Sequence, residues 1–378
     1  MKKILLTVVL ILGVASVVFA GSPNPPFVPG IRPLGMGGAF LAVADDTNVL
    51  FYNPAGLGRI DYTYVSILDQ RFETSQDVID LAKWFLDNQD RLFEKHTDTQ
   101  GSDNQMQNLT TDDINRLTSI RAKFRYDMNI FSLVMHNIGA GLYAYANVDV
   151  GIRQMGLFDM RLDGTLDSDI ILPVSYGREI DVQAMNDFFD TYLAGGRLYA
   201  GGTVKVFQRR NFDEQLSLFE MFDYKLSDEK IDELKSGKLG FGVDIGTLYH
   251  VPQLHSNFAI VVRDLYTHVD NDTVKGNLGF GYAYRPTWRL GPVSDILFAA
   301  DINGINDGNL TLFNKLHLGA EAWIIGVFGL RIGAYQGYPT FGVSIARVLQ
   351  YANYSVEKGH YPGQIEERRH TVSLGINF

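Results

Sequence analysis

The sequence predicts an all-β fold, an antiparallel transmembrane β-barrel of about 14 strands with an N-terminal plug segment and short helical insertions. Three observations support this prediction: an export signal at the start, repeated segments of alternating polarity, and a final strand that ends in Phe378. The 38 Gly, 24 Phe and 19 Tyr, against only 12 Pro, favour one large sheet over several compact domains.

Residues 1–20 have the pattern of a signal peptide. Lys2 and Lys3 precede an apolar stretch, and Ala20 ends a tripeptide with small residues where a signal peptidase cuts. We expect cleavage after Ala20. An uncleaved membrane anchor is the alternative, but the apolar run is short for a membrane span and Pro-rich sequence follows it directly.

Charge and composition exclude several classes of function. The formal net charge is −10, and an acidic protein repels phosphate backbones, so nucleic acid is not an expected partner. The chain has no Cys, and its 8 His show no paired ligand spacing, so neither a metal nor a cofactor is predicted. Beyond residue 20 no apolar run approaches the length of a spanning helix.

The last strand alternates strictly in polarity. Apolar side chains occupy one face, and small or polar ones occupy the other: Val372, Leu374, Ile376 and Phe378 against Thr371, Ser373, Gly375 and Asn377. This is the pattern of a strand between lipid and an enclosed lumen. A soluble β-sandwich also alternates, but its outer face would carry mostly Lys, Glu and Thr, whereas Gly dominates here.

Similar alternation places the barrel in residues 60–378. The strand candidates lie near 60–71, 121–127, 128–137, 139–153, 158–172, 195–210, 238–250, 256–266, 276–288, 294–303, 314–326, 327–337, 340–348, 349–358 and 368–378. Single-chain bacterial barrels have an even number of strands, so we expect about fourteen of these fifteen candidates to be separate strands.

Helical insertions are expected at about 74–119 and 213–236. In the first, Val78, Leu81 and Phe85 form an apolar stripe at helical spacing. Two interpretations remain open: the helices decorate long loops or pack in the barrel mouth, or the stripe forms part of a hydrophobic ligand entry.

Residues 21–59 contain three short motifs in a fixed order. They are Gly35-Met36-Gly37-Gly38, then Asp45-Asp46, then Asn53-Pro54-Ala55. In this order they resemble the FadL-like outer-membrane proteins, including the PorV branch. The stretch from Leu330 to Pro339 is a second, looser match. Outside these motifs the chain is similar to the FadL-like proteins only in its general residue pattern.

The resemblance implies that residues 21–59 fold into the barrel as a plug, or hatch, and that Asn53, Pro54 and Ala55 belong to it. A physical argument agrees, since backbone inside a narrow lumen must approach the wall closely, which favours glycine. A plain turn-rich lead-in is the alternative. Asp45-Asp46 is interpreted as a turn or helix cap, and Asp301 to Gly308 as a turn rather than a calcium loop, because the EF-hand spacing fails.

No motif predicts catalysis. His317 and Ser344 have inward parity on nearby predicted strands, but chance supplies such pairs in a large sheet. The chain is therefore not expected to be an enzyme.

Three functions remain open. The resemblance favours transport of hydrophobic small molecules, such as long-chain fatty acids, across the outer membrane with the plug gating passage. The others are PorV-like binding of exported protein cargo and a structural or adhesive surface barrel. The expected partners are outer-membrane lipid, a hydrophobic ligand, and the barrel assembly machinery, for which Phe378 is the predicted assembly signal. An apolar pocket beside Asn53, Pro54 and Ala55 would favour transport, and a filled lumen with an exposed apolar rim would favour cargo binding.

Overall fold

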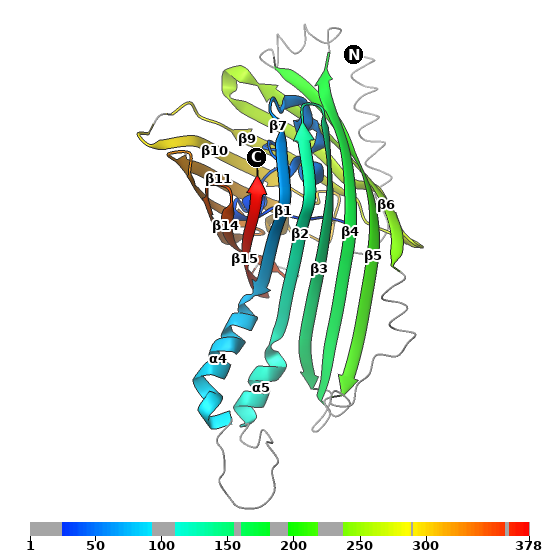
Figure 1. Ribbon diagram of the computed structural model, residues 1–378, viewed down its shortest axis with the longest axis vertical. Coiled ribbons are helices and arrows are strands. Elements are labelled where there is room, and N and C mark those ends of the chain that lie inside the picture. The colour runs from blue at the N-terminus through cyan, green and yellow to red at the C-terminus, as the bar shows by residue number, and fades with distance from the viewer. Residues whose placement is uncertain are drawn as a thin grey trace, which may run out of the picture.

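The computed structural model describes residues 25–92, 110–154, 160–181, 196–217, 237–288, 290–359 and 363–377. Its sheet closes on itself (Figure 1), because β6 pairs with both β5 and β7. The two-residue strand β8 (Asp272–Thr273) only extends the sheet beside β7, and the other strands form a closed 14-strand antiparallel barrel. The predicted fold class is confirmed.

Most strands fall where the polarity pattern placed them. Their bounds are β1 (Tyr64–Ser75), β2 (Arg121–Met135), β3 (Ile138–Gln154), β4 (Met160–Ile180), β5 (Arg197–Ser217), β6 (Lys238–Val251), β7 (Ser256–Val269), β9 (Asn277–Tyr284), β10 (Val293–Ile302), β11 (Leu316–Ile324), β12 (Phe328–Tyr335), β13 (Tyr338–Ile345), β14 (Leu349–Glu357) and β15 (Glu366–Asn377). The candidates 121–127 and 128–137 were wrong as separate strands. They form the single strand β2, which continues through a shift of its register with β3 between Asn129 and Phe131.

Two helices lie between β1 and β2, inside the expected insertion at 74–119. Helix α4 (Gln76–Leu92) follows β1 directly, and α5 (Thr111–Ser119) begins at a capping box between Thr110 and Asp113. In the insertion expected at 213–236, residues 213–217 belong to β5 instead, and 218–236 lie outside the described residues. Among the described helices, none has the length and apolar character needed to cross a membrane.

The outer face of the barrel is apolar. On β15 the side chains of Val372, Leu374 and Ile376 are 42%, 59% and 54% exposed, whereas Thr371 and Ser373 are buried. The same division holds on β5, where Val204 faces out and Lys205 faces in. Exposed apolar side chains on every second residue are those of strands that contact lipid.

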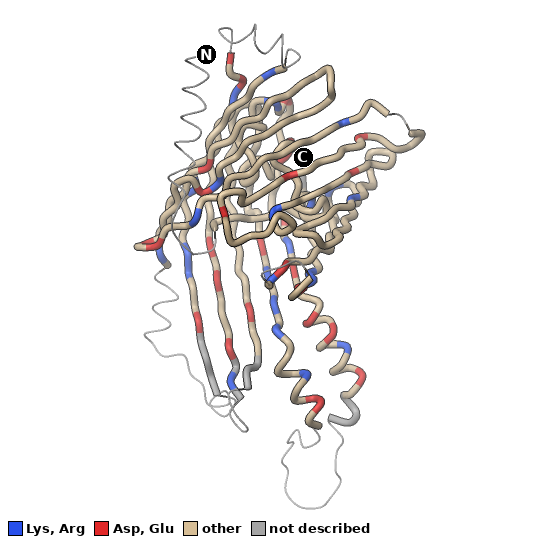
Figure 2. Tube along the Cα trace, turned by 180° about the vertical axis from the view of Figure 1, so that it is seen from behind, with Lys and Arg blue, Asp and Glu red and all other residues tan. Residues whose placement is uncertain are grey.

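One side of the barrel extends well beyond a membrane. Strands β4 and β5 have 21 residues each, roughly 70 Å at about 3.3 Å per residue, whereas the apolar band of such barrels is about 25 Å tall. Figure 2 shows Lys, Arg, Asp and Glu along the extended parts of the long strands and on α4 and α5. These charges mark the part of the sheet that stands in water.

Residues 25–59, which precede β1, lie inside the barrel (Figure 1). This N-terminal segment, residues 25–59, forms α2 (Ile31–Gly35), α3 (Val49–Tyr52) and the 3-10 helix η1 (Pro54–Arg59). Its apolar side chains form the main core together with the inward side chains of the wall. Two further short helices, η4 (Pro252–Leu254) and α8 (Leu312–Lys315), lie in connections between strands.

Candidate functional site

The Gly-rich motif of the N-terminal segment lies against the wall formed by β11, β12 and β13. Gly37 and Gly38 have φ angles of +64° and +80°, which favour glycine. The carbonyl oxygen of Gly37 accepts a hydrogen bond from Nδ1 of His317 at 2.8 Å, and that of Gly35 accepts one from the Thr340 hydroxyl at 3.1 Å. The motif is therefore held through its backbone.

The wall residues that face this motif are glycines as well. A Cβ added at Gly319 would lie 2.4 Å from the carbonyl oxygen of Met36, and one at Gly333 would lie 2.7 Å from the nitrogen of Gly37. Both distances are shorter than real contacts allow, so the backbones meet without side chains between them. We call Gly319, Gly333 and Gly342 the first glycine seat.

Asn53 and Pro54 occupy a second seat on the far side of the lumen. A Cβ added at Gly177 of β4 would lie 2.2 Å from the carbonyl oxygen of Pro54. One added at Gly201 of β5 would lie 2.5 Å from the carbonyl carbon of Pro54. A Cβ on Gly246 of β6 would lie 2.2 Å from Oδ1 of Asn53. We call Gly177, Gly201 and Gly246 the second glycine seat.

The Asn53 side chain, fully buried, uses both ends of its amide. Oδ1 accepts a hydrogen bond from the Ala55 nitrogen at 3.0 Å and so caps η1. Nδ2 donates to the carbonyl oxygens of Leu41 at 2.8 Å and of Thr247, on β6, at 3.2 Å. Asn53 thus joins two parts of the N-terminal segment to the wall.

Asp301 holds the middle of the segment. Its Oδ2 accepts hydrogen bonds from the backbone nitrogens of Phe40 at 2.6 Å and Leu41 at 2.8 Å. Nδ2 of Asn257 donates to the Ala42 carbonyl at 2.9 Å. The interpretation of residues 301–308 as a turn was wrong at its start, because Asp301 lies in β10 and faces the lumen.

Ion pairs join α2 to the wall. Arg32 donates three hydrogen bonds to Glu321 on β11, at 2.8 and 3.2 Å from Nε and at 2.7 Å from Nη2. Glu321 is also paired with Arg331 on β12 at 2.6 Å, and both of these side chains are buried. One carboxylate therefore bridges a guanidinium of the segment and one of the wall.

The Asp pair of the second motif faces the same cluster. Asp45 and Asp46 pair with Nη1 of Arg32 at 2.6 and 2.8 Å, and Asp45 also pairs with Arg285. Burial raises the pKa of Asp45, but the guanidinium groups of Arg32 and Arg285 lower it more, so it falls below its ordinary value of 3.8. Oδ1 of Asp46 accepts from the Asn48 nitrogen, so only Asp46 serves as the expected turn cap.

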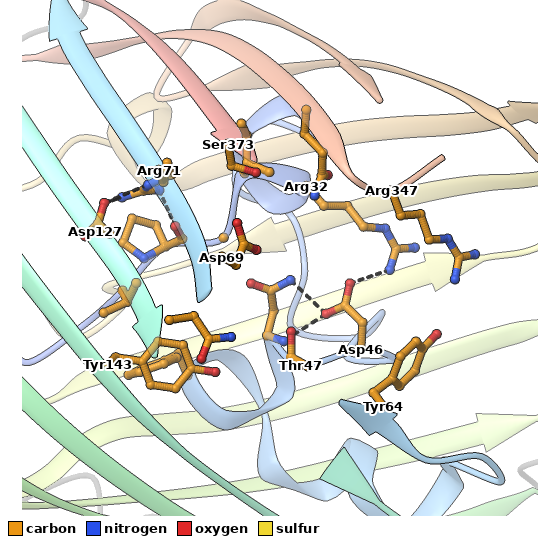
Figure 3. Close-up of a pocket in the computed structure, with 18 of the residues that line it drawn as sticks. Arg32, Asp46, Thr47, Tyr64, Asp69, Arg71, Asp127, Tyr143, Arg347 and Ser373 are labelled. Atoms are coloured by element: carbon orange, nitrogen blue, oxygen red, sulfur yellow. Dashed lines mark hydrogen bonds and ion pairs between the residues drawn. The ribbon is translucent and has the colours of Figure 1, made fainter. Parts of the chain in front are cut away.

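A cavity of about 130 Å³ lies between the N-terminal segment and the wall at β1, β2, β12 and β15 (Figure 3). Four aromatic side chains contribute to its lining: Phe51, Tyr64, Tyr143 and Trp323. The charged side chains of the lining are Arg32, Asp46, Asp69, Arg71, Asp127, Arg331 and Arg347. Asn53, Pro54 and Ala55 do not line this cavity. Those residues fill the second glycine seat.

Two wall strands are irregular at this cavity. On β1, Leu68 and Asp69 interrupt the register with β15, and Leu68 has a φ of 51°. On β2, the register with β3 shifts between Asn129 and Phe131. Asp69 and Asn129 are paired across β1 and β2, so both irregularities lie at one level. Bulges of this kind re-aim side chains next to functional sites.

Three polar atoms at this level are buried without a hydrogen bond of good geometry within the described chain, although the Ser373 hydroxyl and the Asp69 carboxylate interact with each other. They are Oδ1 of Asp69, Oδ1 of Asn129 and Oγ of Ser373, and all three residues line the cavity. In the view of Figure 3, Asp69 lies next to Ser373, with Tyr143 on the other side of the cavity. Buried polar atoms without partners are rare and call for an occupant, either water or a ligand.

The remaining sequence-predicted sites are dispersed. His317 is engaged by Gly37, whereas the Ser344 hydroxyl accepts from Arg331 at 2.5 Å, so the two form no catalytic pair. Phe378 and residues 1–20 lie outside the described residues. The sequence analysis missed Arg32 and Asp69. Inward parity marked many polar wall residues, but parity does not tell which of them meet across the lumen.

No family model matches the chain, and no curated protein matches it. Among solved structures, the TodX deltaS2S3 mutant, titled a monoaromatic hydrocarbon channel, matches 92% of this chain and 98% of its own, with 11% identity and a TM-score of 0.51. The toluene transporter TbuX of Ralstonia pickettii (12% identity, 92% of this chain and 97% of its own, TM-score 0.38) and a Pseudomonas aeruginosa FadL homologue (8%, 95% and 99%, 0.27) are more distant. The predicted likeness to FadL-like barrels is thus confirmed at the level of the fold.

Proposed function

We propose that the chain is an outer-membrane channel for small hydrophobic molecules, and that its N-terminal segment is a plug that gates passage. The observation that carries this proposal is the partly aromatic cavity between the segment and the wall. A purely structural barrel needs no such cavity. The fold is shared with a protein titled a hydrocarbon channel, which is consistent with the proposal.

The volume of the cavity indicates the size of the ligand. A cavity of about 150 Å³ is known to hold one benzene molecule, so about 130 Å³ suits a single ring or a short chain. A long acyl chain would extend beyond it. We therefore propose a smaller cargo than the long-chain fatty acids that the sequence resemblance suggested.

The plug contacts favour displacement as a unit. Besides its apolar packing, it meets the wall at discrete polar and backbone contacts, among them the two glycine seats, the carboxylate of Asp301 and the Arg32–Glu321 pair. A ligand that binds better when the segment has shifted would bias it towards an open position. Gating then needs no change in the barrel itself.

Binding of exported protein cargo is the second candidate. Two observations favour it: the lumen beside both glycine seats is filled, and α8 exposes Leu312 and Phe313 by 66% and 62%. Such an apolar rim suits a protein partner.

The test is uptake of toluene into vesicles that contain the purified chain. Val28 lines the cavity and Val204 faces outwards on β5. Val28→Trp fills the cavity and is expected to slow uptake about tenfold or more, whereas Val204→Trp, the matched control, leaves it unchanged. Uptake no faster than in empty vesicles would reject the channel and leave cargo binding as the better candidate.

A further inference from the structure

We infer that the cavity recognises an uncharged hydroxyl group on a small apolar molecule, such as a phenol or an alcohol, through Asp69, Asn129 and Ser373. This inference rests on the proposed channel function and names the class of its ligand. It follows from hydrogen-bond accounting, from charge and from the shape of the wall.

The hydrogen-bond accounting requires a donor. Nδ2 of Asn129 already donates to the Ser132 hydroxyl at 2.8 Å, which leaves the Asn129 Oδ1 as an acceptor only. Oδ1 of Asp69 is a carboxylate oxygen and also only accepts. The Ser373 hydroxyl can donate or accept. A ligand that enters here must therefore bring at least one hydrogen-bond donor, or leave buried oxygens unsatisfied at a cost in affinity.

An irregularity in the wall directs Asp69 towards the cavity. The irregularity in β1 sets Leu68 and Asp69 against Gly375 of β15, and a Cβ at Gly375 would lie 2.5 Å from Cγ of Asp69. Asp69 is thus folded over a glycine towards the cavity, while Leu68, 52% exposed, faces the other way. A strand without this irregularity would not hold a carboxylate in this position.

Charge disfavours ammonium donors and the common anions. Four Arg and three Asp line the cavity, and Glu321, which pairs with Arg32 and Arg331, balances the fourth Arg, so the surroundings offer no net charge that would favour an ionic ligand. An anionic head group would meet guanidinium groups that already have carboxylate partners, as Arg32 has in Glu321 and Arg71 has in Asp127. It would also be repelled by Asp69. An uncharged hydroxyl satisfies both conditions.

The body of the ligand meets aromatic and aliphatic side chains. Phe51 and Tyr143 face each other edge to face, with ring centroids 4.9 Å apart, and both line the cavity. Ile31 and Val65 also contribute apolar surface. Together with the volume, this lining fits one aromatic ring that carries a hydroxyl at its edge.

Binding of phenol, toluene and benzoate to the full mature chain in detergent tests the inference. Phenol and toluene differ by a hydroxyl in place of a methyl group. We expect phenol to bind about tenfold more tightly than toluene, the ratio of one well-made buried hydrogen bond. Benzoate is expected to bind more weakly than either.

Two variants locate the effect. Ser373→Ala and Asp69→Asn are each expected to reduce the preference for phenol about three- to tenfold while toluene binding stays within about twofold. Thr371→Val is the matched control, because Thr371 also has a buried hydroxyl without a partner on the lumen face of β15, yet does not line the cavity. It should leave the preference intact.

The outcomes separate the two proposals. Equal binding of phenol and toluene, unaltered in Ser373→Ala, would mean that water alone occupies these oxygens, which overturns the inference but keeps the channel. If neither ring binds and neither enters vesicles, the channel proposal fails, and the inference fails with it. Preferred binding of benzoate would also overturn the inference.

Discussion

Arg32 on α2 and Glu321 on β11 lie 289 residues apart in the chain and are joined by three hydrogen bonds between the N-terminal segment and the wall. Glu321 is buried between Arg32 and Arg331, so its carboxylate balances two guanidinium groups. Removing one partner of a buried ion pair costs about 3–5 kcal/mol, because the remaining charge is left without compensation.

Glu321→Gln is therefore expected to destabilise the barrel by a few kcal/mol, whereas Arg32→Ala costs less, because Glu321 keeps Arg331 and Asp45 keeps Arg285 as a partner. The free energy of unfolding in urea, measured in lipid vesicles, checks this order. Equal losses in both variants would show that Arg331 does not support Glu321 when Arg32 is absent.

A methyl group in the second glycine seat should dislodge the plug. In Gly177→Ala the new Cβ meets the Pro54 carbonyl oxygen at 2.2 Å, an overpacking that costs about 1–3 kcal/mol. We expect cleavage of the N-terminal segment by added protease to increase several-fold. Gly202→Ala is the control, since its Cβ would lie 3.5 Å from the nearest atom. Unchanged cleavage of the N-terminal segment in Gly177→Ala would contradict the close contact between Pro54 and the second glycine seat.

Asn53→Ala is expected to loosen the plug and slow uptake without preventing assembly. The variant loses the cap of η1 and leaves the carbonyl oxygen of Leu41 without its donor, at about 1–3 kcal/mol for a buried group. Protease sensitivity and heat-modifiable migration measure the two effects separately.

Asn53→Asp refines this test, because it keeps the acceptor for Ala55 but cannot donate to Leu41. Its defect should equal or exceed that of Asn53→Ala. Failure of either variant to insert into membranes would instead make Asn53 a determinant of folding.

The N-terminal segment should detach from the barrel wall in acid. The pKa of Asp45 lies below 3.8 in the folded protein because Arg32 and Arg285 outweigh burial. A depressed pKa gives stability that is present above the ordinary pKa and is lost as pH falls through the folded one. We expect protease protection of the segment to be flat between about pH 5 and 8 and to fall below about pH 4.

Asp45→Asn should remove part of this acid dependence and reduce protection at neutral pH. A wild-type protein whose protection is unchanged down to pH 2 would argue against an ionised Asp45 as a fastener of the plug.

Deletion of Phe378 is expected to reduce insertion into the outer membrane. Strand β15 pairs with both β14 and β1, so the barrel stays closed only if this strand is in place. The fraction of protein recovered in outer-membrane vesicles measures the effect, with Phe378→Tyr as the conservative control. Full recovery after deletion would discredit the assembly signal.

The barrel could be predicted because its alternation is local: Val372 and Thr371 differ in polarity whatever lies beside them. The site was harder to predict, since its parts come from distant positions. Asp301 looked like the start of a turn, yet its carboxylate binds the backbone of Phe40, a contact that no local pattern encodes. The cavity depends on how α2 and α3 settle against β1 and β15, which sequence spacing does not specify.

The two glycine seats are also two fixed points for the chain that runs between them. One receives Met36 on β11 to β13 and the other receives Pro54 on β4 to β6, and these strands stand on different sides of the closed ring. The chain between them must therefore have a set length. Adding or removing a single residue between positions 39 and 52 would force one end out of register, even if every side chain that touches the wall were kept.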